Sequence, residues 1–227
     1  MTAWVPSDAL GRRILCGTEY ATVRYVGSVS PTAGIWLGVE WDDPQRGKHD
    51  GTYEGTQYFK CRHPRGGSFI RPNKANFGVD FLTAVKGRYG LNDEQDVQHG
   101  TENTLVFGKK PVEFVGMDSV AEQQSQLNQL VDISVRECAV SHAGRKEEIS
   151  RTCANIRHIN LSKNLISSWE TVTAIASQVQ NLETLNISEN KMKFPSTSTS
   201  VSGVFSKLKI LALNQTEITW SEVIIFL

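Results

Sequence analysis

The sequence predicts a multidomain α+β chain, in which a small all-β barrel is followed by an α/β solenoid of repeats. Residues 9–80 are dense in glycine, aromatic and β-branched residues in short alternating runs, which is typical of a tightly turned β-barrel. From residue 127 onward, apolar residues recur every 26 positions, which indicates a repeat architecture. The 227 residues, 39% of them apolar, are enough for two ordinary domain cores.

The repeat is visible in several columns of the sequence at once. Two apolar columns, each with steps of 26, are Val135, Leu161, Ile187, Leu213 and Ile133, Ile159, Leu185, Leu211. Residues 182–192 follow the spacing Leu-x-x-Leu-x-Leu-x-x-Asn-x-Leu, which resembles the leucine-rich repeat. We expect Asn164 and Asn190, at the asparagine position of that spacing, to bond backbone groups where the chain turns inward. Helices on the outer side are expected to begin at two capping boxes, Ser167 with Glu170 and Thr219 with Glu222.

Changes in composition divide the chain into four predicted segments. The barrel covers residues 9–82, an acidic polar linker covers 83–103, a cap of the repeats covers 104–126, and four repeats cover 127–227. The last repeat is incomplete, and the chain ends on an apolar stretch without a polar terminal cap. We therefore expect the solenoid to be truncated at its C-terminus.

The charge balance argues against several classes of function. Twenty-four basic and 24 acidic residues cancel, so no overall field favours nucleic acid or a membrane surface as partner. The first residues lack a signal-peptide pattern, and no uncharged apolar run is long enough to span a bilayer, so we expect a cytoplasmic protein. No phosphate loop, zinc spacing or catalytic triad is convincing, and we expect neither a cofactor nor a metal, nor an enzyme.

Local charge within the barrel region predicts an acidic partner. Residues 46–74 carry seven basic side chains against Asp50 and Glu54. Aromatic residues are interleaved with them: Trp36, Trp41, Tyr53, Tyr58, Phe59 and Phe69. Such a surface suits a peptide with an aromatic residue and a terminal carboxylate. For Tyr58 and Phe59, burial in the barrel core is an equally good interpretation.

Three glycine-rich runs, at 34–41, 47–51 and 67–71, resemble the CAP-Gly family, which binds acidic C-terminal tails such as that of α-tubulin. The resemblance assigns a peptide groove to Trp36, Gly47, Lys48, His49, Gly51, Phe69 and Arg71. Gly47 and Gly51 are expected to adopt positive φ. His49 replaces the family's usual asparagine, which predicts binding that depends on pH near 6.5. Pro31 stands where many members have a phenylalanine, so one wall of the groove is expected to be thinner.

The repeats predict a second binding surface on their concave face. Candidate contact residues flank the buried strand positions: Arg136, His158, Asn160, Thr184 and Asn186. This stripe is small and polar with little net charge, which suits a flat protein partner. A scaffold whose contacts lie outside these residues is the equally weighted alternative.

The order of modules, a CAP-Gly domain followed by leucine-rich repeats, resembles the tubulin-folding cofactor E family, also called tubulin-specific chaperone E. The resemblance implies a non-enzymatic, cytoplasmic and cytoskeleton-associated chaperone. Its partners would be α-tubulin, the α-tubulin C-terminal tail and other tubulin-folding cofactors, and it would assist assembly or dissociation of the αβ-tubulin heterodimer. The alternative is a microtubule-associated adaptor that binds tubulin tails on the polymer without chaperone activity.

Overall fold

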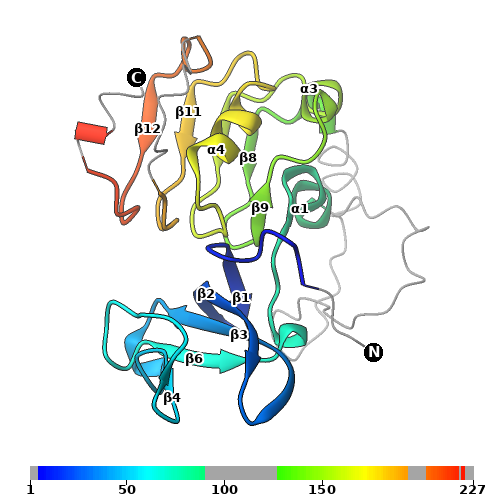
Figure 1. Cartoon of the computed structure of the whole chain (residues 1–227). Coiled ribbons are helices and arrows are strands. Elements are labelled where there is room, and N and C mark those ends of the chain that lie inside the picture. The colour runs from blue at the N-terminus through cyan, green and yellow to red at the C-terminus, as the bar shows by residue number, and fades with distance from the viewer. Residues whose placement is uncertain (1–4, 90–126, 194–202, 220, 223–227) are drawn as a thin grey trace, which may run out of the picture.

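The structure is a computed structural model that describes residues 5–89, 127–193, 203–219 and 221–222. Figure 1 shows two units: an antiparallel sheet built from the first 80 residues, and a parallel sheet built from residues after 127. Each unit has a hydrophobic core of its own. We call them the N-terminal unit and the repeat unit.

The N-terminal unit is all-β, as the sequence predicts. Its sheet has the order β1-β2-β3-β6 and consists of β1 (Arg13–Cys16), β2 (Glu19–Val29), β3 (Thr32–Trp41) and β6 (Gly67–Ile70). The short strands β4 (Thr52–Tyr53) and β5 (Thr56–Gln57) form a hairpin between β3 and β6. After β6 the chain returns to β1, where Leu15 and Asn76 exchange backbone hydrogen bonds of 2.9 and 2.8 Å. One face of this curled sheet buries the core: Ile14, Ala21, Val23, Leu37, Val39 and Trp41.

The repeat unit contains a parallel sheet whose neighbouring strands are one 26-residue step apart. Its order is β12-β11-β10-β8, with β8 (Asp132–Ser134), β10 (His158–Asn160), β11 (Thr184–Asn186) and β12 (Ile210–Ala212). The predicted column Ile133, Ile159, Leu185, Leu211 forms consecutive paired positions of this sheet. The register read from the sequence is therefore the register of the strands.

Two buried asparagines connect neighbouring repeats at the turns that follow the strands. Asn190 is fully buried, and its Nδ2 donates to the carbonyl oxygens of Leu161 and Ile187, each at 2.9 Å. Its Oδ1 accepts the backbone N–H groups of Asn164 and Ile166 at 3.1 and 3.3 Å. Asn164 makes the corresponding contacts one repeat earlier, with its Oδ1 accepting from Val140 N and its Nδ2 donating to Val135 O. This confirms the expected role of the asparagine column, because buried backbone groups must find partners.

Two helices accompany the sheet of the repeat unit: Figure 1 shows α4 (Trp169–Ala176) in front of the strands and α3 (Glu148–Thr152) at the upper right. The predicted cap at Ser167 is wrong by one residue, because the Ser168 hydroxyl accepts the Thr171 N–H at 3.4 Å. In the second predicted box, Glu222 Oε2 accepts the Thr219 N–H at 2.7 Å, which is one of the two expected hydrogen bonds. Most of the helix expected to follow lies outside the described residues.

The predicted linker begins too early. Residues 83–88 belong to α1 (Phe81–Arg88), which contributes Phe81, Leu82, Ala84 and Val85 to the core of the repeat unit. These apolar positions recur at the spacing of one helical face, so burying them outweighs the polarity of the residues around them. The rest of the linker, from residue 90, and the predicted cap at 104–126 lie outside the described residues.

Candidate functional site

The outer face of the N-terminal sheet carries the residues predicted to bind a peptide. Gly38 of β3 pairs with Phe69 of β6 on one side and with Tyr25 of β2 on the other. Because successive side chains of a strand point to opposite faces, Trp36 and Gly38 share one face and the core residues occupy the other. The chain thus brings Tyr25, Trp36 and Phe69 to one surface.

Phe69 is the centre of an aromatic cluster on this surface. Its ring centroid lies 5.1 Å from that of His49, 5.4 Å from those of Tyr58 and Phe59, and 6.3 Å from those of Tyr25 and Tyr53. Most of these contacts are edge-to-face, the arrangement favoured by the charge distribution of aromatic rings. We refer to Tyr25, His49, Tyr53, Tyr58, Phe59 and Phe69 as the aromatic cluster. Tyr53 is 37% exposed, so the cluster is open to solvent at that side.

Gly38 makes room for this cluster. A Cβ at position 38 would lie 2.4 Å from the Phe59 ring and 2.9 Å from Tyr25 Cβ. Phe59 is only 7% exposed and is buried, as the core interpretation of this residue expects. It lies outside the cluster of Ile14, Leu37 and Trp41 and packs against the Phe69 ring instead. Tyr58 is half-buried, and its hydroxyl accepts the Ser30 N–H at 3.3 Å.

The loop of residues 47–51 depends on its two glycines for different reasons. Gly51 has φ +107°, and a Cβ there would lie 2.1 Å from Phe59 O, so its predicted positive φ is confirmed. Gly47 has φ −77°, so the same prediction for Gly47 is wrong. Gly47 is needed for close approach, because a Cβ at that position would lie 1.9 Å from Arg65 O.

His49 stands at the edge of the aromatic cluster as a neutral donor. Its Nδ1 accepts the Gly51 N–H at 3.0 Å, which leaves the proton of the neutral ring on Nε2. Burial lowers the pKa of His49 below its ordinary value, the positive charge of Lys48 lowers it further, and Asp50 opposes the shift. The protonation predicted near pH 6.5 is therefore moved to lower pH.

This lowered pKa predicts a contribution of His49 to stability that depends on pH. A group with a lowered folded-state pKa binds more protons when unfolded, so its contribution is complete above about pH 6.5 and is lost as the pH falls through the folded-state value. We expect the loss of unfolding free energy between pH 7.5 and pH 5 to be smaller in His49→Asn than in the wild type. Urea denaturation of both proteins at the two pH values measures this difference. An equal loss in both would show that folding does not lower the pKa of His49.

Lys48 presents the cation next to the cluster. Its backbone N–H donates to Gly67 O at 2.7 Å, which fixes the residue beside β6, while its side chain is exposed. Within the described parts of the chain, Lys48 forms no ion pair with a carboxylate. Its charge is thus available to an acidic ligand.

Trp36 and Arg71 form a stacked pair on the same face. The Arg71 guanidinium carbon lies 3.7 Å from the Trp36 ring centroid, and Arg71 Nη1 donates to Ala33 O at 2.8 Å. Trp36 Nε1 donates to Thr32 Oγ1 at 2.7 Å. Arg71 therefore orients Trp36. Trp36 is not among the described rings that lie close to Phe69. The structure divides the predicted groove residues into this stacked pair and the aromatic cluster with Lys48.

Tyr25 belongs to the cluster although the sequence did not indicate it. Its place follows from the pairing of β2 with β3, which joins residues 13 positions apart. Arg62, counted among the basic residues of the groove region, lies elsewhere: it forms ion pairs with Glu40 and with Glu217 of the repeat unit.

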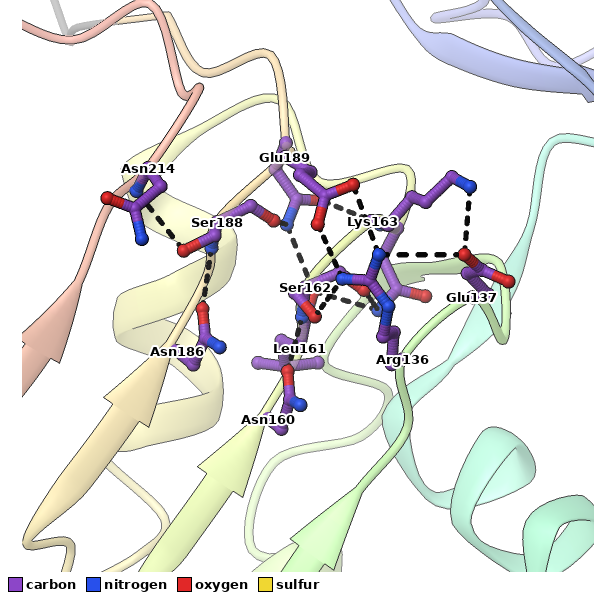
Figure 2. A network of polar contacts seen from close by, with 12 residues as sticks. Arg136, Glu137, Asn160, Leu161, Ser162, Lys163, Asn186, Ser188, Glu189 and Asn214 are labelled. Atoms are coloured by element: carbon purple, nitrogen blue, oxygen red, sulfur yellow. Dashed lines mark hydrogen bonds and ion pairs between the residues drawn. The ribbon is translucent and has the colours of Figure 1, made fainter.

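Figure 2 shows the polar network at the ends of the repeat strands, where several predicted concave-face residues lie. Arg136 donates to both carboxylate oxygens of Glu189, at 2.6 and 3.1 Å, and to Ser162 Oγ at 2.8 Å. This hydrogen bond from Arg136 lowers the pKa of Glu189. Lys163 pairs with Glu137 at 2.8 Å. The charges of this network are thus largely neutralised from within.

The other predicted concave-face residues are partly engaged in local contacts. Asn160 and Asn186 each accept the N–H of the residue two positions on, Ser162 and Ser188, at 3.0 Å. His158 Nε2 lies 3.9 Å from Asp132 Oδ1, and Thr184 is half-buried in the adjacent strand. The structure brings these four residues onto neighbouring strands, as predicted.

Comparison with known proteins identifies the N-terminal unit. Residues 10–75 match the model of the CAP-Gly domain family. They form a CAP-Gly domain. The chain is 59% identical to Tubulin-specific chaperone E of Bos taurus and 57% identical to that of Homo sapiens, over 99% of its own length and 42% of theirs. The resemblance to the N-terminal CAP-Gly portion of tubulin-specific chaperone E is thus confirmed.

The chain spans less than half of the length of these relatives. Among solved structures, the CAP-Gly domain of human kinesin-like protein KIF13B is 35% identical, with a TM-score of 0.32, over 35% of this chain and 80% of that one. No helix in the described residues combines the length and the apolar character needed to cross a membrane. Nor do these residues contain a group of three or more His, Cys, Asp or Glu side chains that could hold a metal ion.

Proposed function

We propose that this protein is a tubulin-folding chaperone whose CAP-Gly domain captures the acidic C-terminal Glu-Glu-Tyr tail of α-tubulin. One observation carries the proposal: Lys48, which is exposed and has no ion pair among the described residues, and the Nε2–H of His49 lie at an open aromatic cluster. Aromatic edges accept a terminal tyrosine ring, and a cation with N–H donors holds carboxylates. The relatives named Tubulin-specific chaperone E support tubulin as the partner.

The proposal predicts that Lys48→Ala weakens binding of such a tail by about 1–2 kcal/mol, the loss expected for one charge-assisted contact. Titration of a labelled peptide, followed by fluorescence polarisation, measures the change. Lys60→Ala is the matched control, because Lys60 is an exposed lysine of the same domain that the groove assignment does not include. Equal affinity of wild type and Lys48→Ala would remove Lys48 from the site.

The nature of the ligand is tested with two peptides that differ by one residue. One ends in Glu-Glu-Tyr and the other lacks the terminal tyrosine. Binding of the first and weak binding of the second would support recognition of the terminal ring by the aromatic cluster. Equal binding of both would mean that the domain reads acidic charge alone, and binding of neither would contradict the proposal.

We further propose that the repeat unit is a leucine-rich-repeat solenoid that engages the body of α-tubulin or other tubulin-folding cofactors. Its support is the parallel sheet with a 26-residue register and the buried asparagines that connect the repeats. A second contact on the same chain becomes intramolecular once the tail is bound, so two weak contacts together give a higher affinity. In this way the protein would assist assembly or dissociation of the αβ-tubulin heterodimer, without an enzymatic step.

A microtubule-associated adaptor is the alternative, because a CAP-Gly domain would also serve to read tails on the polymer. Sedimentation with microtubules and a subunit-exchange assay on free heterodimers distinguish the two. A chaperone accelerates exchange of α-tubulin between heterodimers, whereas an adaptor sediments with polymer and leaves the exchange rate unchanged.

A further inference from the structure

The two units contact each other through residues that are far apart in the sequence. Figure 1 shows β1 and β2 of the CAP-Gly domain directed at the repeat unit. The hydroxyl of Tyr20, the second residue of β2, donates to Lys163 O at 3.1 Å. Tyr20 is half-buried there, and burial, together with the nearby Glu137 carboxylate, raises its pKa to about 12. This contact seats the end of the CAP-Gly sheet on a turn of the repeats.

A chain of ion pairs crosses the contact from the CAP-Gly core outward. Arg13 is 4% exposed and donates through Nη1 to Asp42 Oδ1 at 2.7 Å. The same Asp42 oxygen lies 3.2 Å from Nζ of Lys191, which belongs to the repeat unit. Lys191 Nζ in turn lies 3.4 Å from Glu217 Oε1.

The chain then returns to the CAP-Gly domain. Glu217 Oε2 lies 2.9 Å from Arg62 Nη1, and Arg62 contacts Glu40 through its Nε at 3.3 Å and its backbone N–H at 2.8 Å. Arg24 Nε donates to Glu40 Oε2 at 2.8 Å. Cations and carboxylates therefore alternate through seven residues, and the chain crosses between the units twice.

Burial anchors this chain within the CAP-Gly domain, whereas the two pairs that cross to the repeat unit are partly exposed. Arg13, at one end of the chain, and Glu40, next to the other end, are each 4% exposed. Burial by itself would raise the pKa of Glu40, but hydrogen bonds from the Arg62 N–H and from Arg24 outweigh it and lower that pKa. Arg62 and Lys191 likewise outweigh burial and lower the pKa of Glu217. Both carboxylates thus stay ionised to a lower pH than an ordinary glutamate, whose pKa is about 4.3.

A backbone connection adds a second constraint next to the chain. β7 (Val79–Asp80) pairs in parallel with β9 (Val140–His142) of the repeat unit, directly before α1 enters the repeat core. Gly78 allows this approach: it has φ +89°, and a Cβ there would lie 2.4 Å from Ala139 O and 2.7 Å from Ser141 Cβ. The CAP-Gly domain is therefore attached by paired backbone, by a buried helix and by charge.

We propose that the CAP-Gly domain and the repeat unit form one rigid body, in which the ion-pair chain and the β7–β9 pairing hold the peptide groove at a fixed position relative to the repeat surface. The protein would then offer its two binding surfaces to one partner in a fixed relative orientation. It would lose less conformational entropy on binding than two modules joined by a flexible tether. The inference concerns the protein itself and does not depend on the proposed ligand.

The test is nuclear magnetic relaxation of backbone amides in the whole chain, which gives a rotational correlation time for each unit. The wild type is expected to give one correlation time for both units. Gly78→Ala is expected to give two different times, because the added methyl group separates β7 from β9. Gly17→Ala is the matched control: Gly17 also has positive φ, +64°, but a Cβ there would have no neighbour within 4 Å, so one correlation time is retained.

A second variant tests the proposal even if Gly78→Ala does not fold. Arg62→Glu combined with Lys191→Glu reverses both crossings of the ion-pair chain at side chains that are partly exposed to solvent. We expect faster tumbling of the CAP-Gly domain than of the repeat unit in this variant, and dispersed spectra for both. Two correlation times in the wild type, or one unchanged time in the double variant, would overturn the proposal.

Discussion

Asn190→Ala is expected to destabilise the protein strongly, with a loss of about 3 kcal/mol or more in unfolding free energy. The Asn190 side chain bonds to three backbone carbonyls and two backbone N–H groups, and no solvent reaches it. Alanine would leave these groups buried without partners and would open a cavity between two repeats. Chemical denaturation followed by circular dichroism measures the loss.

Asn214→Ala is the matched control for this substitution. Asn214 follows β12, one repeat after Ser188, but its side chain is exposed, and the contact in Figure 2 is made by its backbone N–H to Ser188 Oγ. We expect a change within about 0.5 kcal/mol. If Asn190→Ala were as mild as Asn214→Ala, the asparagine column would not be what holds the repeats together.

Phe69→Ala is expected to have the largest effect on peptide binding, a loss of about 2 kcal/mol or roughly 30-fold in affinity. Phe69 contacts five other rings, so its removal takes away the centre of the surface that would receive the terminal tyrosine. The measurement is the same polarisation titration with the Glu-Glu-Tyr peptide. Circular dichroism of the variant verifies that the sheet is retained.

Leu10→Ala provides the comparison for Phe69→Ala. Leu10 is 66% exposed and lies outside the aromatic cluster, so its truncation also removes apolar surface but is expected to leave the affinity unchanged. Equal losses of affinity in both variants would indicate a general effect of apolar truncation and would exclude a specific site at Phe69.

The repeat register could be predicted from the sequence because each repeat needs an apolar residue at the same position of its strand. Each strand packs one residue of the column Ile133, Ile159, Leu185, Leu211 against the core, so an apolar residue is needed again after every 26 positions. The asparagine column was predictable for the same reason. The loop glycines and His49 could be found because the family resemblance fixes their spacing.

The features that sequence reasoning missed depend on contacts between distant residues. Tyr25 joins the aromatic cluster only through the pairing of β2 with β3, and Gly38 makes the space that Phe59 occupies. Likewise, the charge and sequence position of Arg62 suggest a groove residue, but its partner Glu217 is 155 positions away. The apolar spacing of α1 was visible, yet only the packed structure shows that this helix belongs to the repeat core.

The most direct test of the proposed peptide site is a titration of the isotope-labelled protein with the Glu-Glu-Tyr peptide, followed by backbone amide chemical shifts. Binding in the groove predicts that the largest shift changes occur at Lys48, His49, Gly51 and Phe69, with little change along β8, β10 and β11. Changes concentrated on those repeat strands, with the loop of residues 47–51 unaffected, would contradict the assignment of the tail to the CAP-Gly domain.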